Sequence, residues 1–165
     1  MIKKGLCFIL SLLFFLVGCH GKSKKDCYEF FKQIQRQMEI PSCAIYRYHP
    51  DQSQNRILSR LYGSEESIMP PAIAFCDDFL LCLYEGDDIW ELHVFRTISI
   101  YDNKRIQEML ISRRDMLQNG ESWGYYSELT QNRVLTAEVF SYQNFVILAV
   151  TDRNEDVHTI LKSMK

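Results

Sequence analysis

The sequence lacks the short motifs that mark the common catalytic and metal sites. Only seven of its 165 residues are glycine, and they form no phosphate-binding loop. Neither a Gly-x-Ser-x-Gly turn nor a His-Glu-x-x-His pattern occurs. No Cys-x-x-Cys pair and no Cys/His spacing of a metal site is present either. We therefore predict no cofactor and no metal, and no reaction is indicated by motif.

The chain also lacks a surplus of positive charge, and its one long apolar run is short for a membrane span. This run is Leu6–Val17, which follows Lys3 and Lys4 and is interrupted by Ser11. A permanent transmembrane helix needs roughly 20 apolar residues, so the run is too short to be one. A positive start followed by a short apolar core is typical of a secretory signal.

The signal ends in Leu16-Val17-Gly18-Cys19, which resembles the lipobox of bacterial lipoproteins. We expect a diacylglyceryl group on the Cys19 thiol and cleavage before Cys19, because a thiolate is the nucleophile that accepts the lipid. The alternatives are a plain secretory signal with an accidental Cys, or an uncleaved anchor. Two acyl chains hold a protein stably where one is marginal. We therefore predict a palmitate-type lipid anchor on the extracytoplasmic face of the cell membrane.

The chain then divides into three parts: a lipoprotein signal peptide (1–18), a lipidated tether (19–25) and a single α+β domain (26–165). Loss of the two signal lysines changes the net charge from −2 to −4, which argues against nucleic acid as a partner. The tether lysines either touch anionic head groups or belong to a solvated linker.

Four cysteines remain as free thiols once residues 1–18 are removed and Cys19 is lipidated. A Cys76–Cys82 disulfide is improbable, since two such positions on one strand lie about 20 Å apart. Cys27–Cys43 could form in an oxidising compartment. The alternative, which we favour, is that all four are small core residues.

Two N-terminal helices are expected. Asp26 begins the first, with Glu29 as a capping-box partner and Pro41 beyond its end. Residues 41–53 are expected to be a loop. Ser53 is expected to cap the second helix, which stops at Gly63.

The remainder predicts a sheet with helices packed against it. Expected strands cover 73–84 (with a bulge or turn at Asp77-Asp78), 90–100, 134–140 and 145–150, and expected helices cover 102–119 and a last segment capped by Asp152. Residues 120–133 are expected to be an aromatic-rich loop. The fold class is therefore α+β in two layers: an antiparallel sheet of about four strands in ββαββα order, preceded by the two helices. Residues 145–150 are apolar on both faces, which predicts a central strand or one covered on both sides.

At this point the chain resembles the small lipoproteins of Gram-positive bacteria that are grouped as a domain of unknown function. The resemblance spans roughly residues 54–165 and is carried by Leu58-Ser59-Arg60-Leu61-Tyr62-Gly63, Trp90-Glu91-Leu92-His93-Val94-Phe95-Arg96, Arg113-Arg114-Asp115-Met116-Leu117 and Asn144-Phe145-Val146-Ile147-Leu148. It implies a lipoprotein and brings no activity and no catalytic residues with it.

Arg113 is the most unusual residue, because it falls within the apolar stripe of its expected helix. A charge there needs a partner. We predict a buried or half-buried pair with Glu91 that fixes the helix on the sheet. The alternative is an arginine that binds an anionic ligand.

Glu91 and His93 share one face of their strand, and Glu138 could lie on a neighbouring strand. Such a cluster could bind a metal or serve a cell-envelope enzyme. We favour the simpler interpretation, an exposed sheet face with mixed polar residues.

Aromatic residues around 123–126 are the other candidate binding residues: Trp123, Tyr125 and Tyr126, with Tyr142 nearby. They could grip an envelope protein or stack on cell-wall sugars. The alternative is a loop that its aromatics fold back onto the core. The sequence thus predicts a membrane-anchored lipoprotein with a non-enzymatic binding or accessory role. An envelope enzyme or metal-binding protein using Glu91, His93 and Glu138 is the second hypothesis.

Overall fold

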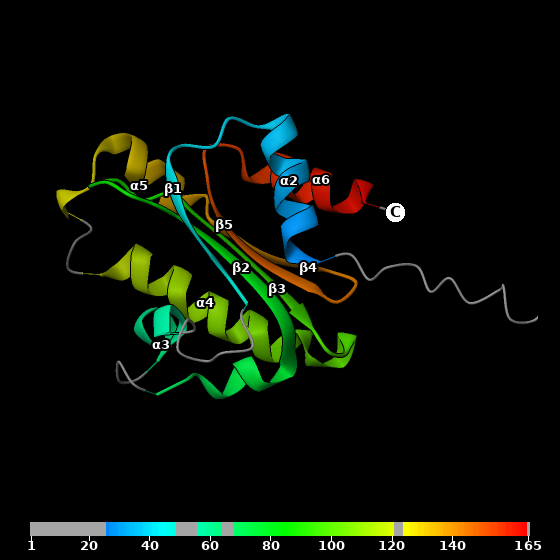
Figure 1. Ribbon diagram of the computed structural model, residues 1–165. Coiled ribbons are helices and arrows are strands. Elements are labelled where there is room, and N and C mark those ends of the chain that lie inside the picture. Colours follow the sequence, from blue (N-terminus) through cyan, green and yellow to red (C-terminus); the bar gives the residue numbers. More distant parts are fainter. Residues whose placement is uncertain (1–25, 49–55, 64–67, 121–123, 165) are drawn as a thin grey trace, which may run out of the picture.

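A five-stranded antiparallel sheet runs through the middle of the molecule (Figure 1). The computed structural model describes residues 26–48, 56–63, 68–120 and 124–164. The strand order is β1-β2-β3-β5-β4, with bounds β1 (Cys43–Arg47), β2 (Cys76–Tyr84), β3 (Glu91–Thr97), β4 (Glu138–Tyr142) and β5 (Phe145–Val150). The predicted α+β class with an antiparallel sheet is confirmed, with five strands in place of about four.

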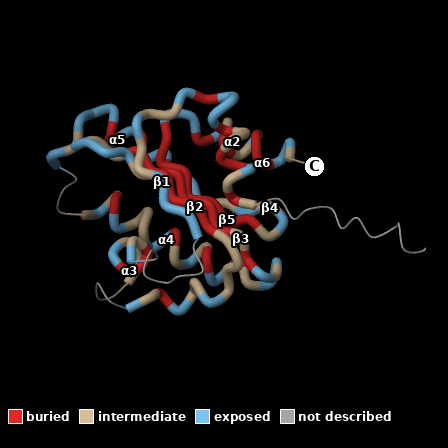
Figure 2. Tube along the Cα trace, in the orientation of Figure 1, coloured by how far each residue is buried: buried red, intermediate tan, exposed pale blue. Residues whose placement is uncertain are grey.

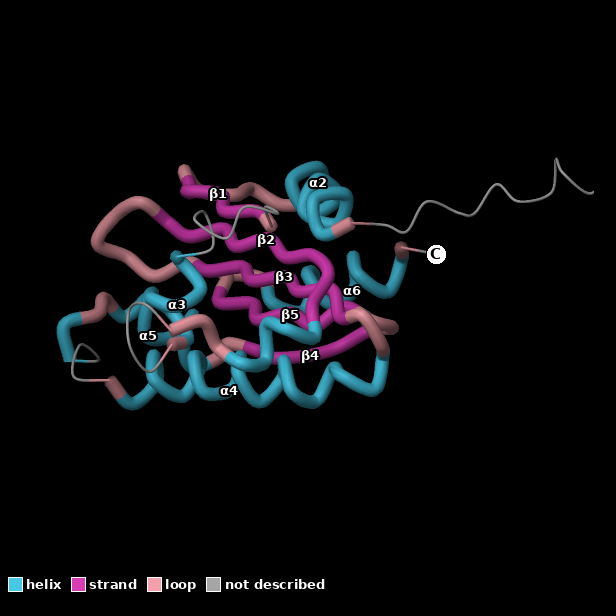
Figure 3. The backbone as a smooth tube through the Cα atoms, turned by 60° about the horizontal axis from the view of Figure 1, so that its bottom comes forward, coloured by secondary structure: helices cyan, strands magenta, loops and turns pink. Residues whose placement is uncertain are grey.

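Helices cover both faces of the sheet, so the molecule has three layers and the predicted two-layer arrangement is wrong (Figure 3). α2 (Cys27–Gln37) and α6 (Asn154–Ser163) lie on one face and contact each other. α4 (Asn103–Asn119) lies on the other face, and α3 (Arg56–Tyr62) and α5 (Glu128–Leu135) pack beside it. The third layer is needed because β5 is apolar on both sides. None of the helices in the described ranges combines the length and the apolar content that a bilayer crossing demands.

The core has two halves, one on each side of the sheet (Figure 2). Side chains alternate between the faces of a strand. On β3, Leu92 and Val94 therefore pack under α2 and α6, while Phe95 packs under α4. All six residues of β5 are buried. The prediction that 145–150 is covered on both sides is confirmed.

α2 begins where the chain enters the described fold. The Asp26 side chain accepts a hydrogen bond from the backbone N–H of Glu29 at 2.7 Å, which satisfies one of the free donors of the first turn. Cys27, Phe30 and Ile34 are buried on one helical face. The amphipathic spacing therefore places α2 flat on the sheet.

The sequence located the long helix and the last hairpin well. α4 covers Asn103–Asn119 against the expected 102–119. β4 and β5 pair from Tyr142↔Phe145, so only Gln143 and Asn144 form the turn, and Gln143 takes a positive φ of 52°. The expected irregularity at Asp77-Asp78 is a β-bulge, where the β2–β3 register shifts.

Two segments predicted as loop are wrong. Residues 43–47 form β1, a short edge strand whose backbone pairs with β2. Because part of this strand is exposed, its side chains do not alternate clearly between apolar and polar. Residues 128–135 form α5, capped by Ser127, which accepts from the Thr130 N–H. β4 consequently starts at Glu138 instead of 134, and the element order differs from ββαββα. Ser53, the expected cap of the second helix, lies outside the described residues.

Asp152 was predicted to cap the last helix, and this is also wrong. α6 begins at Asn154, whose side chain accepts from the backbone N–H and the hydroxyl of Thr151, both at 2.9 Å. Asp152 points instead to Arg133, at 2.8 Å. Asp152 thus pairs with Arg133 on α5 and does not cap α6.

The four cysteines of the domain are all free. Cys27 and Cys82 are buried in the core under α2, which fits their prediction as small core residues. The Cys27–Cys43 disulfide is absent from the structure. Cys43 on β1 instead contacts the thiol of Cys82 on β2.

Candidate functional site

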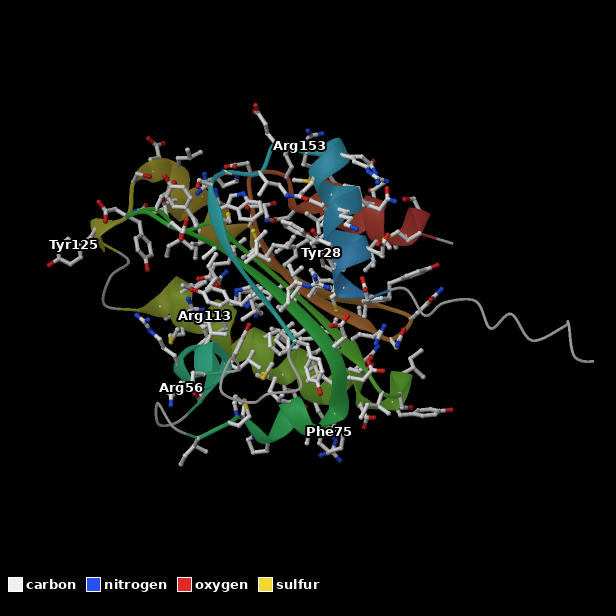
Figure 4. The ribbon with its side chains drawn as sticks, viewed as in Figure 1. Tyr28, Arg56, Phe75, Arg113, Tyr125 and Arg153 are labelled. Atoms are coloured by element: carbon white, nitrogen blue, oxygen red, sulfur yellow. The ribbon has the colours of Figure 1, made fainter. Side chains whose placement is uncertain are left out.

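The predicted pair between Arg113 and Glu91 is present and joins α4 to β3. Arg113 donates from Nη2 to Glu91 Oε1 at 2.5 Å and from Nε to Glu91 Oε2 at 3.2 Å. Both side chains are largely buried, at 13% and 9% exposure. A bidentate pair of this kind is strong and directional. Figure 4 shows Arg113 directed inward from α4.

Each member of this pair favours the charged form of the other. Burial alone would raise the pKa of Glu91, but the neighbouring His93 ring and the Arg113 guanidinium outweigh it and lower this pKa to about 2. Burial would likewise lower the pKa of Arg113, but the Glu91 carboxylate raises it. Glu91 is therefore an ionised carboxylate paired with the Arg113 guanidinium.

His93 extends the cluster into the core, where it is fully buried on the α4 side of β3. Its Nδ1 hydrogen-bonds the Tyr62 hydroxyl, and the two rings meet edge to face. Its Nε2 lies 3.1 Å from Glu91 Oε2, at ion-pair distance but outside hydrogen-bond geometry. Arg113, Glu91, His93 and Tyr62 thus form one continuous polar chain through three elements.

Tyr62 is the member of this chain that the sequence did not identify. It is the last residue of α3, directly before Gly63. Burial raises its pKa, as does the Glu91 charge, so its hydroxyl stays protonated. The only available signal was a tyrosine at the end of a short helix with an amphipathic face, and this does not specify a partner on β3.

Two clefts meet at this chain of residues. One, of about 390 Å³, lies between α3 and α4, where Tyr62, Met109 and Arg113 form part of its wall. The other, of about 360 Å³, lies on the other side of α3, against the β2–β3 end of the sheet, and Glu91 and Arg113 line it. Of the four residues in this polar chain, Arg113 is the one that lines both clefts.

The cluster of Glu91, His93 and Glu138 that the second hypothesis requires does not form. The favoured interpretation, an exposed sheet face, is also wrong for Glu91 and His93, because both are buried. Glu91 and His93 pair across the sheet with Val150 and Leu148, which face α4. Glu138 pairs with Ala149, which faces α2 and α6. The β4–β5 register therefore places Glu138 on the opposite face of the sheet. Within the described residues, no three His, Cys, Asp or Glu side chains gather as a metal ion would require.

The candidate aromatics behave differently from one another. Tyr125 is 92% exposed, and its side chain points away from the molecule (Figure 4). Tyr126 is half-buried, and its carbonyl accepts from Gln131 at 3.1 Å. Tyr142 packs against the core under α2 and α6. Trp123 lies outside the described residues. Among the described aromatics, Tyr125, Tyr126 and Tyr142 therefore form no single patch.

A second ion cluster, not predicted from the sequence, surrounds the buried Arg133 of α5, whose two carboxylate partners are exposed to solvent. Its guanidinium donates to Asp152 at 2.9 Å, to Asp88 at 3.0 Å and to the Ile89 carbonyl at 2.7 Å. Burial alone would raise the pKa of Asp88, but Thr130 and Arg133 lower it. The cluster ties α5 to the β2–β3 turn and to the segment before α6.

No family model, curated protein or solved structure matches the chain. The resemblance to small lipoproteins of Gram-positive bacteria therefore stays a prediction from the sequence.

Proposed function

We propose that this chain is a lipoprotein anchored by a lipid on Cys19, on the extracytoplasmic face of the cell membrane, with a binding role and no catalytic one. The observation that carries the proposal is Leu16-Val17-Gly18-Cys19 at the end of a short apolar run, seven residues before the fold begins at Asp26. Seven residues extend at most about 25 Å. The domain would therefore be held close to the bilayer.

The internal polar cluster supports binding over catalysis. Both oxygens of Glu91 accept from Arg113, and His93 is fully buried beneath Tyr62. A general acid or base must reach a substrate within hydrogen-bond distance. Glu91, His93 and Tyr62 interact with one another and with Arg113. We therefore assign this cluster the structural role of holding α3, β3 and α4 together.

A surface at the far end of the molecule from α2 supports the binding role. Tyr125 precedes α5 at this end (Figures 1 and 4). Leu129 and Leu135 on α5 are exposed as well. Exposed aromatic and aliphatic side chains are typical anchors of protein interfaces. We assign this membrane-distal surface, defined by Tyr125, Leu129 and Leu135, to an envelope protein partner.

The anchor is tested by growing cells with labelled palmitate and measuring the mass of the mature protein. We expect label on the wild-type chain, a mature N-terminus at Cys19 and no label on Cys19→Ala. Cys7→Ala, in the discarded signal, is the matched control and should be labelled normally. An unlabelled wild-type protein would overturn the anchor.

The binding role is tested by placing a photo-crosslinking phenylalanine derivative at Tyr125 in the anchored protein. We expect a discrete adduct with an envelope protein. The same group at exposed Glu155 on α6 is the control and should give none. Equal or absent crosslinking at both positions would contradict the assignment of the distal surface.

A further inference from the structure

The chain enters the fold at one particular end of the sheet. The backbone N–H of Cys27 donates to Asp78 Oδ2 at 2.7 Å, so the first turn of α2 is tied to the start of β2. Asp78 lies opposite Arg96, near the end of β3. The position of Asp26 is therefore fixed relative to the β2 start and the β3 end.

Three further segments meet at this same end (Figure 1). The Ile98 N–H donates to the Phe75 carbonyl at 2.9 Å, directly before β2. The Thr97 N–H donates to the Asn144 carbonyl in the β4–β5 turn at 2.7 Å. The Asn103 side chain donates to the Gln143 carbonyl, also at 2.7 Å. The loop between β3 and α4 is thus held rigidly beside the point where the tether arrives.

This rigid loop exposes apolar side chains that the fold itself leaves uncovered. Ile98 and Ile100 are each 58% exposed, and Tyr101 is 91% exposed. After Asp102 and Asn103 come two basic residues. The Lys104 side chain is 83% exposed and lies 3.9 Å from Glu108, and Arg105 lies over the Phe75 ring at 4.3 Å. Nearby Asp77 is paired with Arg96 at 2.6 Å. An aromatic and aliphatic tip flanked by Lys and Arg is the composition that settles at a membrane interface.

We infer that the tip formed by Ile98, Ile100 and Tyr101 contacts the lipid bilayer surface and sets the orientation of the domain on the membrane. The inference rests on the proposed Cys19 anchor, because the tether brings the bilayer within about 25 Å of Asp26, at the end of the sheet that carries the tip. Lipid head groups and the upper acyl region cover the apolar tip, and anionic head groups attract Lys104 and Arg105. The membrane-distal surface around Tyr125 then points outward.

The test compares two tyrosines that are equally exposed at opposite ends of the molecule. Tyr101→Trp and Tyr125→Trp are each made in the full lipidated protein, reconstituted in vesicles of phosphatidylcholine and phosphatidylglycerol with or without brominated acyl chains. The wild-type emission, from Trp90 and Trp123, is subtracted as background. We expect brominated lipid to quench the added emission of Tyr101→Trp, and the added emission of Tyr125→Trp to be unaffected. Because both positions are almost fully exposed, neither substitution should disturb folding.

Co-sedimentation with the vesicles separates the two proposals. A protein that fails to sediment refutes the anchor, and with it the basis of the inference. An anchored protein in which Tyr101→Trp is quenched no more than Tyr125→Trp overturns the inference and leaves the anchor intact. As a further check, Ile98→Glu with Ile100→Glu should abolish the quenching of Tyr101→Trp while sedimentation is retained.

Discussion

Arg113 and Glu91 are 22 residues apart in the chain and form a two-pronged ion pair between α4 and β3, with Nη2 2.5 Å from Oε1 and Nε 3.2 Å from Oε2. The pair sits where α3, α4 and the sheet meet. Glu91 Oε2 also lies 3.1 Å from His93 Nε2, and the Tyr62 hydroxyl hydrogen-bonds the other ring nitrogen of His93. Stability measurements can therefore test how the helices on this side are fastened.

Arg113→Met should strongly destabilise the domain. The substitution keeps an apolar stem but leaves the Glu91 carboxylate buried without its main partner, which costs about 3–5 kcal/mol in the free energy of unfolding. Urea denaturation measures this cost. Arg114→Met is the matched control, since Arg114 pairs with Asp115 at the surface and should contribute below about 1 kcal/mol. Equal costs for the two variants would contradict the fastening role.

Stability should fall in acid through Glu91. Its pKa is about 2 in the fold, below its ordinary value of 4.5, so its stabilisation is fully present above pH 4.5 and is lost as the pH falls towards 2. The loss is on the order of 3 kcal/mol at 1.36 kcal/mol per pKa unit. Urea denaturation of wild type and Glu91→Gln at several pH values tests this. The difference between the two proteins should shrink in acid, and a difference that does not change with pH would refute it.

Tyr62→Phe should destabilise the domain without disturbing its packing. The ring stays between His93 and Phe95, but His93 Nδ1 loses its hydrogen-bond partner. A buried polar atom left without a partner costs about 1–3 kcal/mol. Thermal unfolding reports the loss, and Tyr125→Phe, at an exposed position, should leave the midpoint unchanged. If the two variants melt together, the hydroxyl has no structural role.

The four domain thiols should react slowly with a disulfide reagent in the folded protein. Burial raises the pKa of each of them, to about 12 for Cys76, so little thiolate is present near neutral pH. Cys43 should react first because it is half-buried and lies on an edge strand, whereas Cys27 and Cys82 are fully buried. Denaturant without reductant should release four reactive thiols. Only two would indicate a disulfide that the structure does not contain.

Much of the fold and part of the site were predictable from the sequence. Apolar residues at helical spacing located α4. The expected turn around Tyr142-Gln143-Asn144 located the β4–β5 turn, although the expected strand before it began four residues too early. The Arg113–Glu91 pair was predictable because a charge in an apolar stripe needs a partner, and the carboxylate at the start of the preceding sheet strand was a candidate. Segments with weak periodicity failed: β1 shows little alternation, and α5 has few buried apolar residues.

The sequence by itself determined which residues are apolar, where helices can start and stop, and the lipobox-like Leu16–Cys19 that precedes the fold, because these depend on neighbours along the chain. Apart from the Arg113–Glu91 pair, only the tertiary structure decided which residues meet across elements. Strand register placed Glu138 on the face opposite Glu91 and His93, since a shift of one residue reverses the face of every side chain. Packing of α3 brought Tyr62 onto His93, and sheet pairing brought Cys43 to Cys82. These contacts depend on distances through space, which residue spacing along a single chain does not encode.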